Sequence, residues 1–175
     1  AQARESHIQL AMERVRARTM AMQKSEELPD AANILFQQVQ SLGMPAWSAG
    51  YCIWGENKKE ITLWMSSAGI IQQPFKAPVT EDPAFIHFYE AWQGGESFYV
   101  VEMGGEELVS HYEYMCNLPV VGEMLNKFVD ERNSLPAFQI FHLAFFPQGF
   151  LLFITYEPVP EAQHIFRRLG SVFEQ

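Results

Sequence analysis

The chain has 175 residues and a formal net charge of −9, and 48% of its residues are apolar. This length and composition favour one ordered domain with a sizeable core and argue against intrinsic disorder. The acidic balance disfavours nucleic acid as a partner, because basic side chains supply most of the affinity for phosphates. The sequence has no uninterrupted apolar run of about 18 residues, which a membrane-spanning helix needs.

The first predicted element is a helix over residues 1–24, which contain neither Gly nor Pro. Its apolar side chains form a narrow stripe with the heptad spacing of a coiled coil. The stripe consists of Ile8, Met12, Val15 and Met22. Five basic residues against two acidic ones make this segment basic, whereas the rest of the chain carries seven against nineteen. Because such a helix is only marginally stable alone, we expect a signalling helix that pairs with a second copy of the chain.

The rest of the chain, residues 25–175, is predicted to form the globular domain. Its first helix is expected to begin at the N-cap Ser25 and to end before Gly43, and it has a wide apolar face. A β-hairpin follows, with strands over Trp47–Trp54 and Glu60–Ser66. Residues 70–80 contain two prolines, Pro74 and Pro78, which favours an edge strand or a loop.

The middle of the chain contains helical and extended patterns in turn. Asp82-Pro83 is typical of a helix start, with Asp82 as the N-cap and Pro83 in the first turn, and Gly94-Gly95 ends this helix. The further elements are a strand and two helices, predicted over Ser97–Met103, Glu106–Cys116 and Val120–Glu131.

A second hairpin is predicted near the C-terminus, with strands over Ala137–Phe146 and Phe150–Glu157. The turn Pro147-Gln148-Gly149 joins them, and we expect Gly149 to adopt a positive φ there. Both faces of these strands are apolar, which is typical of central strands that are covered on both sides. A last helix follows, with apolar residues spaced by four at Ile165, Leu169 and Phe173.

This order of elements predicts an α+β fold with one central antiparallel sheet of five or six strands. The first and last helices are expected to cover one face of the sheet, and the helices inserted between residues 82 and 131 are expected to cover the other. A small-molecule cavity is expected on the side of the inserted helices.

The segment from Ala11 to Leu28 has the sequence AMERVRARTMAMQKSEEL. It resembles the string ALERVRxRTMAMxxSxEL, which precedes GAF-like domains in large bacterial sensor proteins such as hybrid histidine kinases, with Met12 in place of the usual Leu. The order of elements in the rest of the chain is also similar to that of GAF-like domains. The resemblance implies a regulatory input module with a signalling helix, a sensor body and an exit helix. It implies no particular ligand, because neither a bilin-attaching region nor a cyclic-nucleotide signature is present.

Catalytic motifs such as GxSxG, the P-loop, HExxH and GxGxxG do not occur, and the five histidines are dispersed. We therefore expect no catalytic residue and no metal site, and the cofactor is left unspecified. A ligand pocket is expected where strand aromatics face the helix over Glu106–Cys116, whose polar-tipped rings suit a pocket wall. The candidate pocket residues are Trp64, Phe98, His111, Tyr112, Cys116 and Phe141. Ordinary packing of the same side chains is the alternative interpretation.

The resulting hypothesis is a cytoplasmic sensory input domain that binds a small molecule or transmits a signal through its terminal helices. Its expected partners are a second copy of the chain, joined through the N- and C-terminal helices, and the adjacent domains of the same protein. Two isolated cysteines without a CxxC motif fit a reducing cytoplasm. The alternatives are a ligand-free dimerisation module and a thiol-dependent GAF-type reductase with Cys52 or Cys116 as the nucleophile.

Overall fold

The computed structural model describes residues 1–21, 27–67, 70–131 and 133–173. These residues form six helices and seven strands. The helices are α1 (Gln2–Ala21), α2 (Leu28–Ser41), α3 (Pro83–Gln93), α4 (Gly105–Cys116), α5 (Val121–Asp130) and α6 (Ala162–Ser171). The strands are β1 (Ala46–Trp54), β2 (Glu60–Ser67), β3 (Ile70–Ile71), β4 (Phe75–Pro78), β5 (Phe98–Gly104), β6 (Phe138–Phe146) and β7 (Gly149–Thr155). Among the described residues no helix is both long and apolar enough to cross a bilayer.

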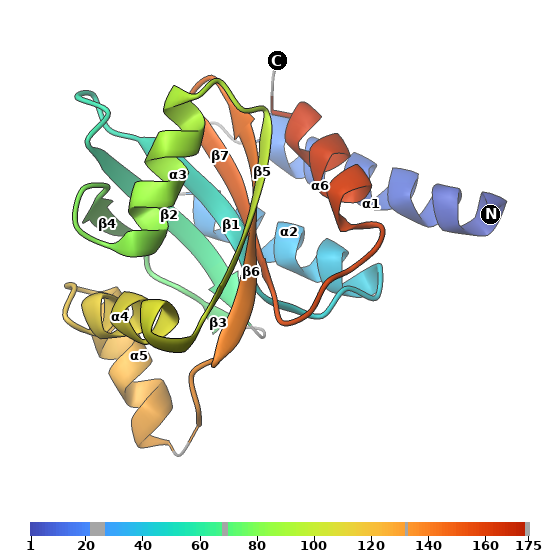
Figure 1. Cartoon of the computed structure of the whole chain (residues 1–175). Helices are drawn as coiled ribbons and strands as arrows, with labels where there is room; N and C mark the ends of the chain where they lie inside the picture. Colours follow the sequence, from blue (N-terminus) through green and yellow to red (C-terminus); the bar gives the residue numbers. More distant parts are fainter. Residues whose placement is uncertain (22–26, 68–69, 132, 174–175) are drawn as a thin grey trace.

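The seven strands belong to one antiparallel sheet with the order β3-β2-β1-β7-β6-β5 (Figure 1). Strands β3 and β4 share one edge, because both pair with β2 at different points along its length. The first and last hairpins meet in the middle of the sheet, where β1 pairs with β7. The sheet is therefore six positions wide, and the predicted α+β fold with an antiparallel sheet is confirmed.

The central strands β1, β7 and β6 are covered on both faces. All seven residues of β7 are buried, and so are all residues of β6 except the first. Alternate side chains of β7 enter two separate apolar cores, since Leu152 belongs to one core and Phe153 to the other. The apolar pattern on both faces of the last hairpin therefore predicted the centre of the sheet correctly.

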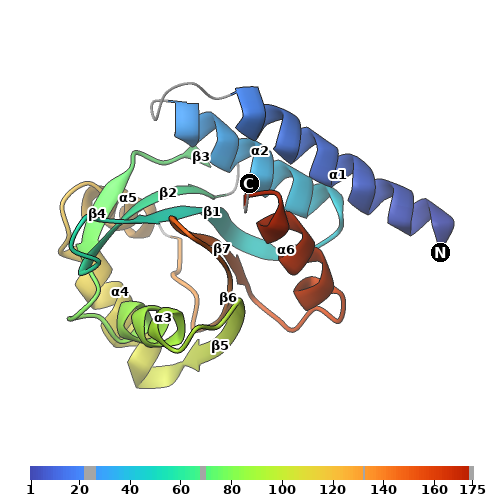
Figure 2. The same ribbon diagram turned by 90° about the horizontal axis from the view of Figure 1, so that it is seen from above.

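The helices form two layers on opposite sides of the curved sheet (Figure 2). Helices α1, α2 and α6 cover its outer face, and their apolar side chains form one core with that face. Helices α3, α4 and α5 lie on the concave side and contribute to the second core. This arrangement is the one that the order of elements predicted, with the terminal helices on one face and the inserted helices on the other.

The apolar stripe of α1 is buried within the chain and not displayed as a dimer seam. Ile8, Met12 and Val15 are only 4%, 7% and 1% exposed. They share a core with the apolar faces of α2 and α6, while Met22 lies outside the described residues. Heptad spacing indicates that a helix needs a partner, but it does not specify whether the partner belongs to the same chain. The contacts of Ile8, Met12 and Val15 therefore lie within the chain, where the sequence analysis expected a seam between copies.

Polar contacts accompany the packing of α1 against α6. Arg168 donates to both carboxylate oxygens of Glu5, at 2.8 and 3.1 Å, and Arg4 pairs with Glu161. These pairs lie at the exposed edge of the interface, where an ion pair contributes about 0–1 kcal/mol. Apolar burial rather than charge is therefore the main attraction between these helices.

Two glycines show where the turn predictions hold and where they fail. Gly43 has a φ of +81° and follows the end of α2, as predicted. Gly149 begins β7 and does not have the positive φ that we expected. A Cβ there would lie 1.9 Å from the carbonyl oxygen of Cys52, so the close approach of β1 requires the glycine. The predicted N-cap Ser25 lies outside the described residues.

The substitution Met12→Glu is predicted to destabilise the folded chain. An unpaired carboxylate in the core beneath α1 is expected to lower the free energy of unfolding by about 2–4 kcal/mol. Chemical denaturation at several protein concentrations measures this change. Leu10→Glu is the matched control, because Leu10 is 48% exposed on the same helix and its substitution should change stability by less than about 0.5 kcal/mol. Unchanged stability with a halved mass in light scattering would instead support the dimer seam.

Candidate functional site

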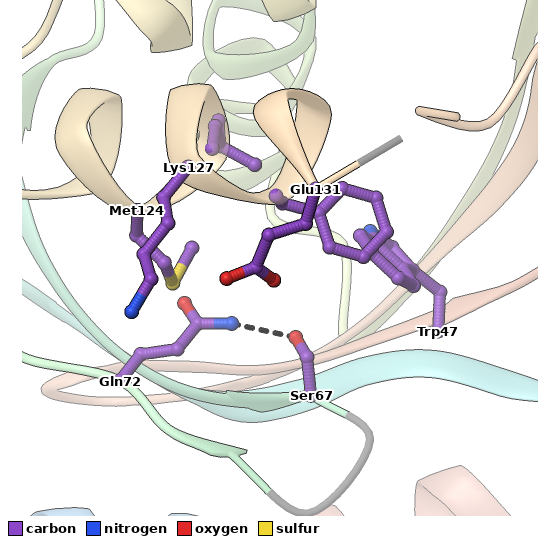
Figure 3. Close-up of a pocket in the computed structure, with 8 residues that line it drawn as sticks. Trp47, Ser67, Gln72, Met124, Lys127 and Glu131 are labelled. Carbon is purple, nitrogen blue, oxygen red and sulfur yellow. Dashed lines mark hydrogen bonds between the residues drawn. The ribbon is translucent and has the colours of Figure 1, made fainter. Parts of the chain in front are cut away.

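Two adjoining chambers lie between the concave face of the sheet and helices α4 and α5. The outer chamber has a volume of about 200 Å³. It is lined by Trp47, Ser67, Gln72, Met124, Leu125, Lys127, Phe128 and Glu131 (Figure 3). The inner chamber has a volume of about 60 Å³ and is reached by side chains of α4. Because five residues line both chambers, we treat them as one candidate site with the outer chamber as its mouth.

One apolar face of α5 forms a wall of the outer chamber. Leu125 is buried, and Met124 and Phe128 are half-buried beside it, at the spacing of neighbours on one side of a helix. The ring of Phe128 meets Trp47 of β1 edge-on, with 5.3 Å between the ring centroids. Apolar and aromatic groups therefore make up much of the chamber wall, which is typical of small-molecule sites.

A strained turn precedes α5. Val120 has a φ of +71° and a ψ of −70°, and the amide of Val121 donates to the carbonyl of Pro119 at 2.9 Å. These angles and this hydrogen bond define a γ-turn of the rare form, which is unfavourable for a β-branched residue. A cost of about 1–3 kcal/mol is typical of such a conformation. The packing of α5 over the cavity therefore offsets a local conformational preference.

A buried carboxylate and an imidazole fix the position of α4 over the inner chamber. One oxygen of Asp82, Oδ2, accepts hydrogen bonds from the amides of Ala84 and Phe85 at 3.0 and 3.2 Å and so caps α3, as the sequence predicted. The same oxygen lies 2.8 Å from Nδ1 of His111, which lines the inner chamber. Because a carboxylate only accepts, Nδ1 carries the proton in this contact.

A second buried polar pair lies next to His111. The hydroxyl of Tyr112 donates to Oε1 of Gln139 at 2.6 Å. Burial raises the pKa of the Tyr112 hydroxyl, so it stays neutral and acts as a donor. Within the described part of the chain, Nε2 of Gln139 is buried without a hydrogen-bond partner. The polar side chains of His111 and Tyr112 at the inner chamber are thus already hydrogen-bonded to Asp82 and Gln139. Few polar groups there remain to bind a ligand.

The structure brings together three of the six predicted pocket residues. His111, Tyr112 and Phe141 line the inner chamber. Cys116 lies near the end of α4 and lines a different and more open groove on the outside of the molecule, which Tyr112 also borders. Of the three predicted pocket residues on α4, His111 and Tyr112 therefore line the cavity, and Cys116 does not.

Trp64 and Phe98 do not reach this cavity, and their placement corrects the sequence prediction. Both pack into the core on the face that α1, α2 and α6 cover. Side chains alternate along a strand, and the neighbours of Trp64 on β2, Leu63 and Met65, face the cavity. Phe98 faces α6 instead, and the guanidinium of Arg167 lies 5.3 Å from its ring centroid.

The residues that the sequence analysis missed are mainly those of α5 and of the loop after β3. They are Gln72, Met124, Leu125, Lys127, Phe128 and Glu131. The apolar face of α5 was a signal for packing, but no sequence pattern showed that this helix stops short of filling the space below it. The presence of two opposite charges four residues apart, Lys127 and Glu131, was the available clue.

Burial shifts the pKa values of several titratable groups outside these pairs. Burial raises the pKa of both thiols, well above its usual value for Cys52, whereas a nucleophilic cysteine needs a lowered pKa. Burial lowers the pKa of His142, on the opposite face, to about 4, and its ring packs on Phe166 of α6. Among the described residues, no group of His, Cys, Asp or Glu side chains is arranged to hold a metal ion.

Comparisons of the chain with family models, curated proteins and solved structures found no match.

The substitution Asp82→Ala is predicted to loosen the inner wall of the cavity. It removes a helix cap and a buried hydrogen bond to His111, so the free energy of unfolding should fall by about 2–4 kcal/mol. Denaturation measures the loss, and long-range ¹H–¹⁵N spectra of the histidines report whether Nδ1 of His111 is still the protonated nitrogen. Asp130→Ala, at an exposed position of α5, is the control. A wild-type stability and an unchanged His111 spectrum would show that the pair does not hold the wall.

Proposed function

We propose that the chain is a GAF-like sensory input domain that binds a small molecule in the cavity beneath α4 and α5. The observation that carries this proposal is the pair of adjoining chambers between the concave face of the sheet and these helices. They lie on the side of the inserted helices, and their walls combine aromatic rings with a few polar groups. This composition is that of a ligand site rather than of a packing defect.

Transmission of the signal is proposed to follow from the sheet between the two layers. Strands β1 and β7 contribute alternate side chains to the cavity core and to the core beneath the terminal helices. A ligand that displaces these strands therefore acts on both layers. Helices α1 and α6 lie side by side on the far face (Figure 2), where the relative position of the first and last helices carries the change.

The resemblance of residues 11–28 to the string that precedes GAF-like domains supports the same function. In this proposal the chain is a regulatory segment of a bacterial signalling protein such as a hybrid histidine kinase, located in the cytoplasm and linked to neighbouring domains. A homodimer remains part of the proposal, but its contacts would use exposed residues of α1 such as Met20. The raised pKa values of Cys52 and Cys116 argue against the alternative of a thiol-dependent reductase.

Methionine methyl groups provide probes on both faces of the sheet. Met65, Met115 and Met124 line the cavity, and Met12 and Met44 lie in the core beneath the terminal helices. A fragment library screened against chain labelled with ¹³C-methyl methionine is expected to yield ligands that shift Met124. The same ligands are expected to shift Met12 or Met44, because the strands between the two cores move together.

Leu125→Trp is the matched variant for this screen, since an indole at that position fills the chamber and should abolish the shifts. Val109→Trp, at an exposed site on α4, should leave them unchanged. Shifts confined to the cavity methyl groups would contradict transmission. A library without any binder would support the ligand-free interaction module instead.

A further inference from the structure

The outer chamber is lined by two charged side chains, and these carry opposite signs. Lys127 lies on α5, and Glu131, four residues later, directly follows the helix. Both side chains extend toward Gln72 on the opposite wall (Figure 3). Within the described part of the chain, neither residue takes part in an ion pair. An ammonium and a carboxylate are therefore held at the mouth of an apolar cavity without pairing to each other.

The order of these two residues explains why they remain separate. An acidic residue four positions before a basic one pairs well on a helix, whereas the reverse order found here is the weaker arrangement. Each group is consequently open to an opposite charge that enters the chamber. A ligand with one positive and one negative group matches both, whereas a ligand with a single charge meets one attractive and one repulsive partner.

The remaining lining defines the rest of the ligand. Trp47 and Phe128 supply aromatic surface to the chamber that Glu131 also lines, and such rings attract an ammonium group. On the opposite wall, Gln72 donates from Nε2 to Oγ of Ser67 at 2.6 Å, which leaves its amide oxygen as an acceptor. A chamber of about 200 Å³ that adjoins the inner chamber of about 60 Å³ suits a small metabolite.

We propose that the outer chamber binds a free α-amino acid with an apolar side chain. The carboxylate of the amino acid pairs with Lys127, its ammonium pairs with Glu131, and its side chain lies along Trp47, Phe128 and Leu125 toward the inner chamber. This assignment rests on the proposed function as a sensory domain and names the ligand class of the same site. A residue within a peptide is excluded as the ligand, because it lacks the two terminal charges.

Isothermal titration at neutral pH with L-leucine and L-phenylalanine tests the assignment. The comparison compounds are isopentylamine and 4-methylpentanoate, which each keep one of the two charges of leucine, and neutral 4-methylpentanamide. We expect leucine or phenylalanine to bind at least tenfold more tightly than these three comparison compounds. Each of the three lacks at least one of the two charged groups and so loses a charge-assisted hydrogen bond.

Two variants assign the charges to their residues. Lys127→Gln and Glu131→Gln should each weaken amino-acid binding at least tenfold. Lys127→Gln should also improve the binding of isopentylamine, and Glu131→Gln that of 4-methylpentanoate, since each removes the repulsive partner. Lys59 and Glu56 lie on the exposed turn between β1 and β2, at the other end of the sheet (Figure 1). Lys59→Gln and Glu56→Gln are therefore the control variants, and each should change the affinity for the amino acid less than twofold.

The possible failures are distinguishable. Equal affinity for the amide and the amino acids, or wild-type affinity in both charge variants, would overturn the zwitterion assignment while the sensory function stands. If none of these compounds bound and a wider fragment screen also found no ligand, the assignment and the proposed function would fall together.

Discussion

Burial of both faces of β1, β7 and β6 is the constraint on which the rest of the structure depends. Strands that are apolar on both sides need a covering layer on each side, and helices alone can supply both layers here. The terminal helices α1, α2 and α6 cover one face, and the inserted helices α3, α4 and α5 cover the other. Because neighbouring residues of one strand enter different cores, as Tyr51 and Cys52 do on β1, the two layers share a backbone.

The two faces differ in how tightly they are filled. On the outer face, the rings of Phe153 and Phe166 stack with 4.0 Å between their centroids. The space between α6 and β6 is so narrow that a Cβ on Gly170 would lie 2.7 Å from that of Ala144. On the concave face, the strained turn at Val120 and the buried Asp82 hold the inserted helices around open space. A tightly packed face transmits displacement, whereas an open one accepts a ligand.

Patterns within single elements were predictable from the sequence, and partners across the fold were not. The cap at Asp82 and the two-sided apolar strands depend on nearby residues, so the helix start and the centre of the sheet could be inferred. The stripe of α1 gave the buried face of the helix but not its partners within the chain, because its spacing does not distinguish α2 and α6 from a second copy. Trp64 and Phe98 were assigned to the pocket by residue type, although strand alternation places them on the other face. The cavity itself depends on how far α5 stands from the sheet, which no sequence pattern encodes.

Native-state hydrogen exchange, measured residue by residue across a urea series, tests the central role of the shared strands most directly. If both layers depend on these strands, the amides of β1, β7 and β6 exchange only through global unfolding, while α5 and the ends of α1 and α6 open at lower free energies. If the amides of β7 opened at the same low free energy as those of α5 while α1 and α2 stayed protected, the two layers would be independent. In that case the sheet could not couple the cavity to the terminal helices.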